Sequence, residues 1–237
     1  MRRRTGSRAA HLSAGIGHTS LGSRVMAMIP LRYAFQPVAT CRRMKRPPSL
    51  DGTFSAWSRD YLLADWIVDE EHPPFATVYT AWDDACLYFA FQANLRRAPR
   101  ALPRRFWSGD CVEVFLDLRG TLNHNEYTEH CHHFFLLPQG GGNTTAHAGR
   151  CEPGVEHQIA IAHDETVLVA SEAFPQGYRM EVAFPRAAIP TYDPASFPSV
   201  GFNYLVREGG GRTQFWSVGP ELQTFRDPST WGELELA

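Results

Sequence analysis

Histidines are concentrated in the middle of the chain. His124, His130, Cys131, His132 and His133 lie within ten residues of one another. On a strand, alternate side chains point to opposite faces, so residues 130 and 132 share one face and residues 131 and 133 the other. Two histidines spaced in this way can bind one metal ion, with a neighbouring glutamate as a third ligand. Three interpretations stay open for the cluster: polar residues of an edge strand, hydrogen-bonding groups for a ligand, or metal ligands with His130 and His132 as candidates.

A pair of carboxylates lies in the segment CVEVFLDL at 111–118, whose even-numbered residues are all Val or Leu and form one face of a predicted strand. Glu113 and Asp117 share one face of this predicted strand, about 7 Å apart along it. Two carboxylates at such a separation are the groups that glycosidases use. Alternating acids are also common on exposed strands, and the sequence has no nucleophile elbow, phosphate-binding loop or dinucleotide-binding motif. We therefore predict a protein that is not an enzyme.

The same region has residues that suit the binding of a sugar. An aromatic ring covers the C–H face of a sugar, while carboxylates and amides pair with its hydroxyl groups. Trp107 stands at the entrance of the predicted strand beside Ser108 and Gly109, where we expect its ring to be exposed. Asp110 follows and either caps a turn or contacts a sugar.

Strand patterns recur along the rest of the chain and helical periodicity is scarce. Gly, Pro and Asn clusters separate most of these short segments, as in β-sandwiches and barrels. We predict an all-β protein with one domain at 31–237 and strands at 76–82, 85–92, 111–118, 132–138, 166–174, 178–185, 199–208, 213–219 and 231–237.

Composition excludes several classes of protein. The chain has 237 residues, of which 43% are hydrophobic and 20% charged, and its formal net charge is −2. Residues 1–28 contain five arginines and no acid, so the remainder is acidic, which argues against nucleic acid as a partner. No apolar run approaches the ~18 residues of a membrane helix.

The N-terminal segment 1–30 is rich in Arg, Ser and Gly. It lacks the apolar stretch of a secretory signal. We interpret it as a disordered or mis-assigned segment, with Met26 and Met28 as alternative starts. This predicts a cytoplasmic protein whose five cysteines are reduced.

Six blocks, in order, resemble the family 9 carbohydrate-binding modules. The resemblance covers roughly residues 45–237. Its blocks are PSLDG with Ala56-Trp57, AWDDACLY at 81–88, WSGDCVEVFLD at 107–117, YRME at 178–181, GFN at 201–203, and FWS at 215–217 with RDPSTWGEL at 226–234.

The resemblance implies an antiparallel β-sandwich of jelly-roll or immunoglobulin-like type, related to the DOMON folds, that holds a terminal sugar between two aromatic rings. Trp107 stands at the position of the first ring, and Phe225 replaces the tryptophan of the second. Glu113 matches the glutamate that binds hydroxyl groups. In the next strand His133 replaces an amide and Phe135 an arginine, which departs from the family pattern. Four tryptophans fall in the structural blocks and are expected in the core: Trp57, Trp82, Trp216 and Trp231.

The resemblance also leaves other functions open. Family 9 modules are attached to glycoside hydrolases, which implies a place in carbohydrate catabolism, and they often bind structural calcium, for which Asp83, Asp84 and Asp117 are possible ligands. Some DOMON relatives bind haem, and Met180 and His132 are the candidate ligands. A scaffold with a decayed sugar site is a third interpretation. The oligomeric state is left open.

Overall fold

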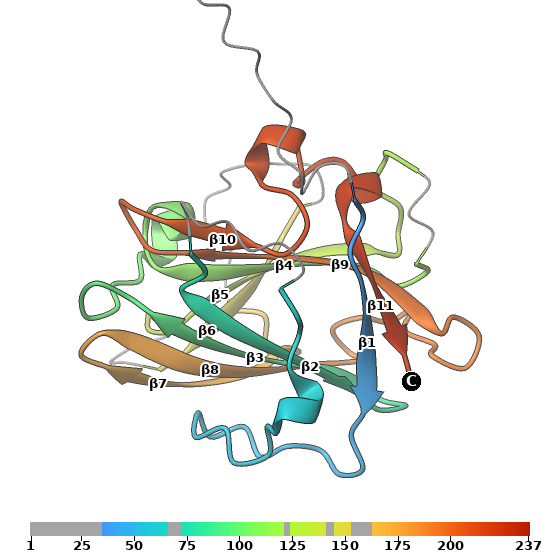
Figure 1. The fold of residues 1–237 in the computed structure, drawn as a ribbon, viewed down its shortest axis with the longest axis horizontal. Helices are drawn as coiled ribbons and strands as arrows, with labels where there is room; N and C mark the ends of the chain where they lie inside the picture. Colours follow the sequence, from blue (N-terminus) through green and yellow to red (C-terminus); the bar gives the residue numbers. More distant parts are fainter. Residues whose placement is uncertain (1–34, 66–72, 121–123, 141–144, 153–162) are drawn as a thin grey trace, which may run out of the picture.

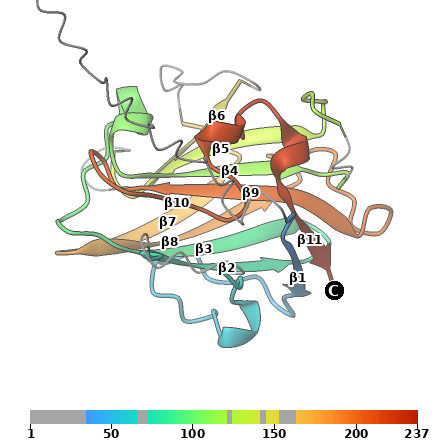
Figure 2. The same cartoon turned by 45° about the horizontal axis from the view of Figure 1, so that its top comes forward.

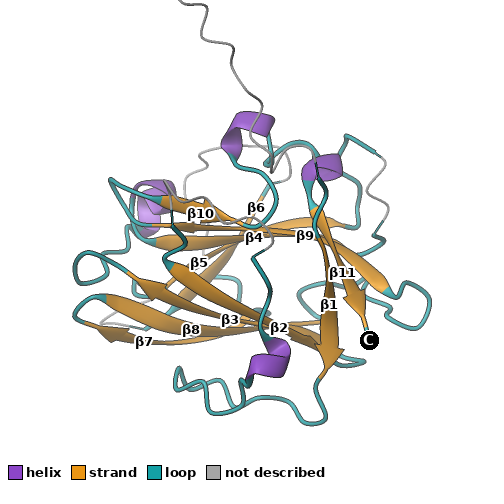
Figure 3. Cartoon of the chain, viewed as in Figure 1, coloured by secondary structure: helices purple, strands orange, loops and turns teal. Residues whose placement is uncertain are grey.

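The computed structural model describes residues 35–65, 73–120, 124–140, 145–152 and 163–237. The predicted segment 1–30 lies outside these ranges. Strands and short 3-10 helices are the regular elements of the described residues (Figure 3). None of the helices described is long and apolar enough to cross a membrane. The all-β prediction is therefore confirmed.

The strands are β1 (Val38–Arg43), β2 (Ala76–Trp82), β3 (Cys86–Asn94), β4 (Cys111–Asp117), β5 (Cys131–Leu137), β6 (His147–Cys151), β7 (Leu168–Phe174), β8 (Gly177–Pro185), β9 (Ser199–Arg207), β10 (Thr213–Phe215) and β11 (Gly232–Leu236). Nine of these strands coincide with predicted segments, whereas β1 and β6 were not predicted. The 3-10 helices are η2 (Arg59–Tyr61), η3 (Pro103–Ser108), η4 (Pro220–Leu222) and η5 (Pro228–Thr230).

The strands form one continuous sheet in the order β6-β5-β4-β9-β11-β1-β2-β3-β8-β7, with β10 paired to β9. β1 lies beside β11 on one side and β2 on the other, and both pairings are parallel (Figures 1 and 2). The other pairings are antiparallel. The predicted antiparallel arrangement therefore has an exception at β1, which joins the two halves of the sheet.

The main core lies between the two halves. Phe89 of β3 stacks on Phe202 of β9 with ring centroids 5.0 Å apart, and Phe134 of β5 packs on Phe184 of β8 at 4.6 Å. The inward apolar row of β4 joins this core, as its alternation predicts. Burial of these rings supplies the main driving force for folding, because each removes a large apolar surface from water.

The opposite, outer face of β4 and β5 is buried as well. Every residue of both strands has little exposed surface, although an exposed strand was one interpretation of the alternating acids of β4. Phe106 of η3 packs over one part of this face, and Phe225 and Trp231 cover another. The sequence pattern of β4 could not show this, because Phe225 and Trp231 lie far away along the chain.

The opening block of the family pattern docks onto β8 through Glu181. This fully buried carboxylate accepts hydrogen bonds from the backbone N–H groups of Asp51 and Gly52, at 3.0 and 2.6 Å. It also accepts one from Trp57 Nε1 at 2.9 Å. Two blocks that are 124 residues or more apart thus form one structural contact. The four tryptophans expected in the core are buried: Trp57, Trp82, Trp216 and Trp231.

Candidate functional site

Glu113 occupies the middle of the buried outer face. Glu113 is only 2% exposed to solvent. His133 of β5 lies with Nε2 3.0 Å from Glu113 Oε2, and Arg207 of β9 lies with Nη2 3.4 Å from Oε1. β4 pairs with both strands, so sheet register alone brings these three side chains together.

The electrostatics favour an ionised Glu113. Burial raises the pKa of a carboxyl group, but the hydrogen bond and charge of His133 and the charge of Arg207 oppose it. The net result is a pKa of Glu113 below its ordinary value. Among the described residues, His133 Nδ1 and Arg207 Nε are buried without a hydrogen-bond partner. Unpaired buried polar atoms are unusual and suit a hydroxyl-rich ligand.

Aromatic rings lie next to this charged group. Phe115 stacks on the His133 ring with centroids 4.3 Å apart. Phe225 meets Phe115 edge-on at 5.8 Å and lies 6.1 Å from His133. Phe225 is only 6% exposed, so its ring is a wall of a packed face in this structure.

Trp107 lies at the neighbouring part of the same face and is partly exposed. Its ring meets Phe106 edge-on at 5.3 Å, and Phe106 stacks on Phe135 at 4.3 Å. Phe135 is directly opposite Glu113 in the sheet. Gly149 makes room for this stack, since a Cβ there would lie 2.2 Å from the Phe135 ring. Sequence reasoning did not single out Phe106 or Gly149.

Asp110 holds the backbone that carries Trp107. It is fully buried and accepts two hydrogen bonds from Arg97, at 2.8 and 3.1 Å, and one from the Gly209 N–H at 2.8 Å. The N–H of Arg100 donates to it as well. The partners of Asp110 lie 10 or more residues away along the chain, so these contacts join separate segments, and its contact with a sugar stays a prediction.

The GFN and RDP blocks hold the segment that carries Phe225. Asn203 Nδ2 donates to the carbonyl of Val218 and to Thr224 Oγ1, both at 2.9 Å. Trp231 Nε1 donates to the carbonyl of Thr224, also at 2.9 Å. Trp231 was predicted to lie in the core, and the contacts of Asn203 and Trp231 explain how they position the predicted site residue Phe225.

Of the candidate metal ligands, only Asp117 lies in a three-ligand cluster of the described residues; the other four are His130, His132, Asp83 and Asp84. Asp83 caps the β2–β3 turn and accepts a hydrogen bond from the Tyr88 hydroxyl, while Asp84 pairs with Arg43. His130 Nε2 lies 3.7 Å from Glu129.

His132 is held as a neutral ring beside β6. Arg150 Nη1 donates to its Nδ1 at 3.0 Å. Burial, together with the charge of Arg150, lowers the pKa of His132 to about 4. Met180, the other candidate haem ligand, is fully buried in the main core.

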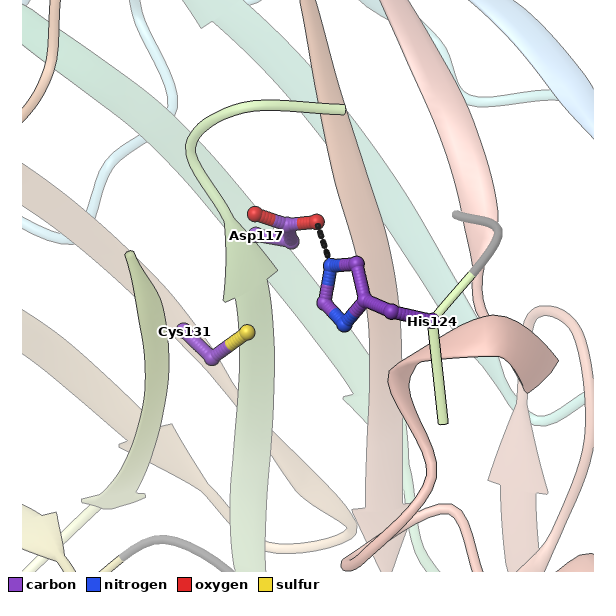
Figure 4. A group of neighbouring side chains, drawn as sticks. All are labelled: Asp117, His124 and Cys131. Atoms are coloured by element: carbon purple, nitrogen blue, oxygen red, sulfur yellow. Dashed lines mark hydrogen bonds and ion pairs between the residues drawn. The ribbon is translucent and has the colours of Figure 1, made fainter. Parts of the chain in front are cut away.

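A different set of side chains does come together. Asp117 at the end of β4, His124 in the following loop and Cys131 at the start of β5 have ligand atoms within 4.8 Å of one another (Figure 4). His124 and Cys131 belong to the histidine-rich segment, but sequence reasoning did not group them with Asp117. Only sheet register places residues 117 and 131 opposite one another.

Solved structures of other proteins have a similar fold. A family 9 carbohydrate-binding module from Caldicellulosiruptor kristjanssonii in complex with cellotriose matches with a TM-score of 0.57 and 17% identity, over 84% of this chain and 93% of that one. The same organism's module in complex with glucose matches at 0.57 and 16%, over 86% and 96%. A putative carbohydrate-binding protein from Bacteroides uniformis matches at 0.57 and 14%, over 86% and 100%.

No curated protein matches the chain. The model of one family, described as carbohydrate family 9 binding domain-like, matches residues 51–237. This range includes the blocks that dock on Glu181 and those that surround Glu113. The chain therefore belongs to the carbohydrate family 9 binding domain-like family.

Proposed function

We propose that this protein is a non-catalytic carbohydrate-binding domain that binds a saccharide at the outer face of β4, β5 and β9. The observation that carries the proposal is the Glu113 carboxylate between His133 and Arg207, beside aromatic rings. Charged groups that fix hydroxyls next to rings that cover C–H faces are the two requirements of a sugar site.

Each group has a distinct role in the proposal. The Trp107 ring is partly exposed and stacks on the sugar. The ionised Glu113 accepts hydrogen bonds from hydroxyl groups, and the unpaired Nδ1 of His133 and Nε of Arg207 complete the polar set. Phe225 forms the second aromatic wall. Asp110 acts indirectly, by positioning Trp107.

Burial of the site has a consequence for affinity. Glu113 and His133 are each 2% exposed, so a sugar that reaches them must displace side chains packed above. Displacing packed side chains costs free energy, and phenylalanine at position 225 offers less ring area than tryptophan. We therefore expect weaker binding than at an open site with two tryptophans.

The ligand class that we propose is the end of a glucose- or xylose-based saccharide, with a role in carbohydrate catabolism. Two family 9 modules with the same fold are in complex with cellotriose and glucose. The pair Glu113 and Asp117 does not support hydrolysis, because each carboxylate is held by other side chains: His133 and Arg207 for the first, His124 for the second.

Calorimetric titration of the full chain with glucose, cellobiose, xylose and xylobiose tests the proposal. At least one ligand should bind saturably, and Trp107→Ala should weaken its affinity at least tenfold, a loss of about 1.4 kcal/mol or more. The control is Phe35→Ala, which removes an aromatic ring that is 64% exposed and is not among the residues of the proposed site. Equal affinity in Trp107→Ala and wild type would contradict the proposal, as would release of sugar from the oligosaccharides.

A further inference from the structure

Asp117, His124 and Cys131 bring an oxygen, a nitrogen and a sulfur ligand atom to one place. Figure 4 shows the three side chains pointing toward a common point from the end of β4, the loop after it and the start of β5. Asp117 is fully buried and Cys131 is 3% exposed, so two of the three groups are removed from bulk water. A buried carboxylate gains from a cation close by, because burial penalises its charge.

The hydrogen bonds of His124 determine which of its nitrogens faces Asp117. His124 Nδ1 lies 2.8 Å from the carbonyl oxygen of Glu126, which can only accept, so Nδ1 carries the proton. The other ring nitrogen, Nε2, lies 3.3 Å from Asp117 Oδ2 and is the atom that would bind a metal ion next to this carboxylate. A backbone carbonyl on the far nitrogen is also the usual partner of a metal-bound histidine.

The spacing of the ligand atoms fits a small tetrahedral ion. Bond lengths of about 2.0–2.1 Å to nitrogen or oxygen and about 2.3 Å to sulfur place tetrahedral ligands roughly 3.3–3.6 Å apart. The distance between Asp117 Oδ2 and His124 Nε2 is 3.3 Å, which already falls in this range. The other distances are at most 4.8 Å, so a shift of about an ångström or less in a side chain closes the site.

We propose that Asp117, His124 and Cys131 bind a divalent transition-metal ion of the zinc class. Imidazole and thiolate ligands select such ions, whereas calcium prefers sites made of oxygen atoms. The site therefore differs in chemistry from the calcium expected at Asp83, Asp84 and Asp117, although Asp117 is a ligand in both predictions. It would tie the loop between β4 and β5, whose Tyr127 packs on Trp231 at 5.6 Å, to the outer face.

Cobalt binding tests the site, because a cobalt–thiolate bond gives a charge-transfer absorption band that imidazole and carboxylate ligands do not. The full chain, stripped with a chelator, should bind one equivalent of Co²⁺ with this band, and Zn²⁺ should displace it. Cys131→Ser should abolish the band, and His124→Ala should weaken Co²⁺ binding at least tenfold. Circular dichroism checks that both variants fold.

Two control variants separate this site from its neighbours. Cys86→Ser alters a partly exposed cysteine on β3, and His130→Ala removes a histidine next to Cys131. Both should keep the band and the stoichiometry. The proposal is overturned if the wild-type protein does not bind one equivalent of Co²⁺ saturably, or if the absorption band survives in folded Cys131→Ser. It is also overturned if His124 only forms an imidazolium pair with Asp117 and this pair is unchanged when Zn²⁺ is added.

Discussion

At the scale of single residues, the main feature is an ionised carboxylate buried in the outer face of the sheet. Glu113 keeps its charge because His133 and Arg207 lower its pKa by more than burial raises it. Breaking such a pair by removing one partner is costly, since the other charge remains buried and uncompensated. The same arrangement makes Glu113 important for the stability of the fold and a candidate for binding a sugar.

Glu113→Gln should therefore lower the free energy of unfolding by about 3 kcal/mol at pH 7. Because the folded-state pKa of Glu113 lies below its ordinary value of 4.5, its contribution is present above that pH and is lost as pH falls through the folded-state pKa. Urea unfolding at pH 7, 5 and 3 should show a smaller acid-induced loss in Glu113→Gln than in wild type. Glu235→Gln, at an exposed position, should retain the wild-type acid dependence.

Much of this site follows from sequence. The alternation of residues 111–117 predicts that Glu113 and Phe115 share a face, and the family pattern adds Trp107, His133 and Phe225. The partner Arg207 was not predicted, because its approach depends on the register between β4 and β9. Burial of the face was not predicted either, since Phe106 and Trp231 cover it through tertiary contacts.

At the scale of elements, tight contacts between loops and strands hold the family blocks in place. Gly52 has φ +81°, and a Cβ at this position would lie 2.8 Å from the backbone nitrogen of Glu172 in β7. Its own N–H donates to the buried Glu181. A side chain at position 52 would therefore be strained in its backbone and would press on the edge of the sheet.

Gly52→Ala should destabilise the protein by more than the ~1–2 kcal/mol that a left-handed backbone alone costs an L-residue. Gly210→Ala is a matched control, because Gly210 has φ +74° and a Cβ added there would meet nothing within 4 Å. Thermal unfolding followed by circular dichroism compares the two. An equal loss of stability in both variants would show that the close approach of a Cβ at position 52 to the backbone of Glu172 does not contribute to the destabilisation.

The predicted segments match the strands well, because strict alternation and turn residues are local signals. The predicted strands 76–82 and 85–92 form the β2–β3 hairpin, with Asp83 capping its turn. The parallel pairing of β1 had no local signal. It depends on β11, which lies almost 200 residues away along the chain.

At the scale of the whole molecule, β1 connects the two halves of the sheet through parallel pairs with β11 and β2. The main core draws rings from both halves, as in the stack of Phe89 on Phe202. Neither half has a complete core of its own, so the two should fold as one cooperative unit.

Urea unfolding followed by far-ultraviolet circular dichroism and by tryptophan fluorescence should give coincident transitions. Trp57 lies on β2 and β8 side chains of one half, and Trp231 packs on Phe115 of the other, so fluorescence samples both halves. Two separate transitions would show that the halves are independent and that β1 does not couple them.

The most direct test of the account is the tryptophan emission of the full chain during titration with glucose, xylose and their disaccharides. Trp57, Trp82, Trp216 and Trp231 are at most 9% exposed, whereas Trp107 is partly exposed at the proposed sugar site. We expect a saturable change in emission with at least one sugar, and its loss in a folded Trp107→Ala variant. An unchanged emission of wild type with every sugar, or the same change in both proteins, would contradict it.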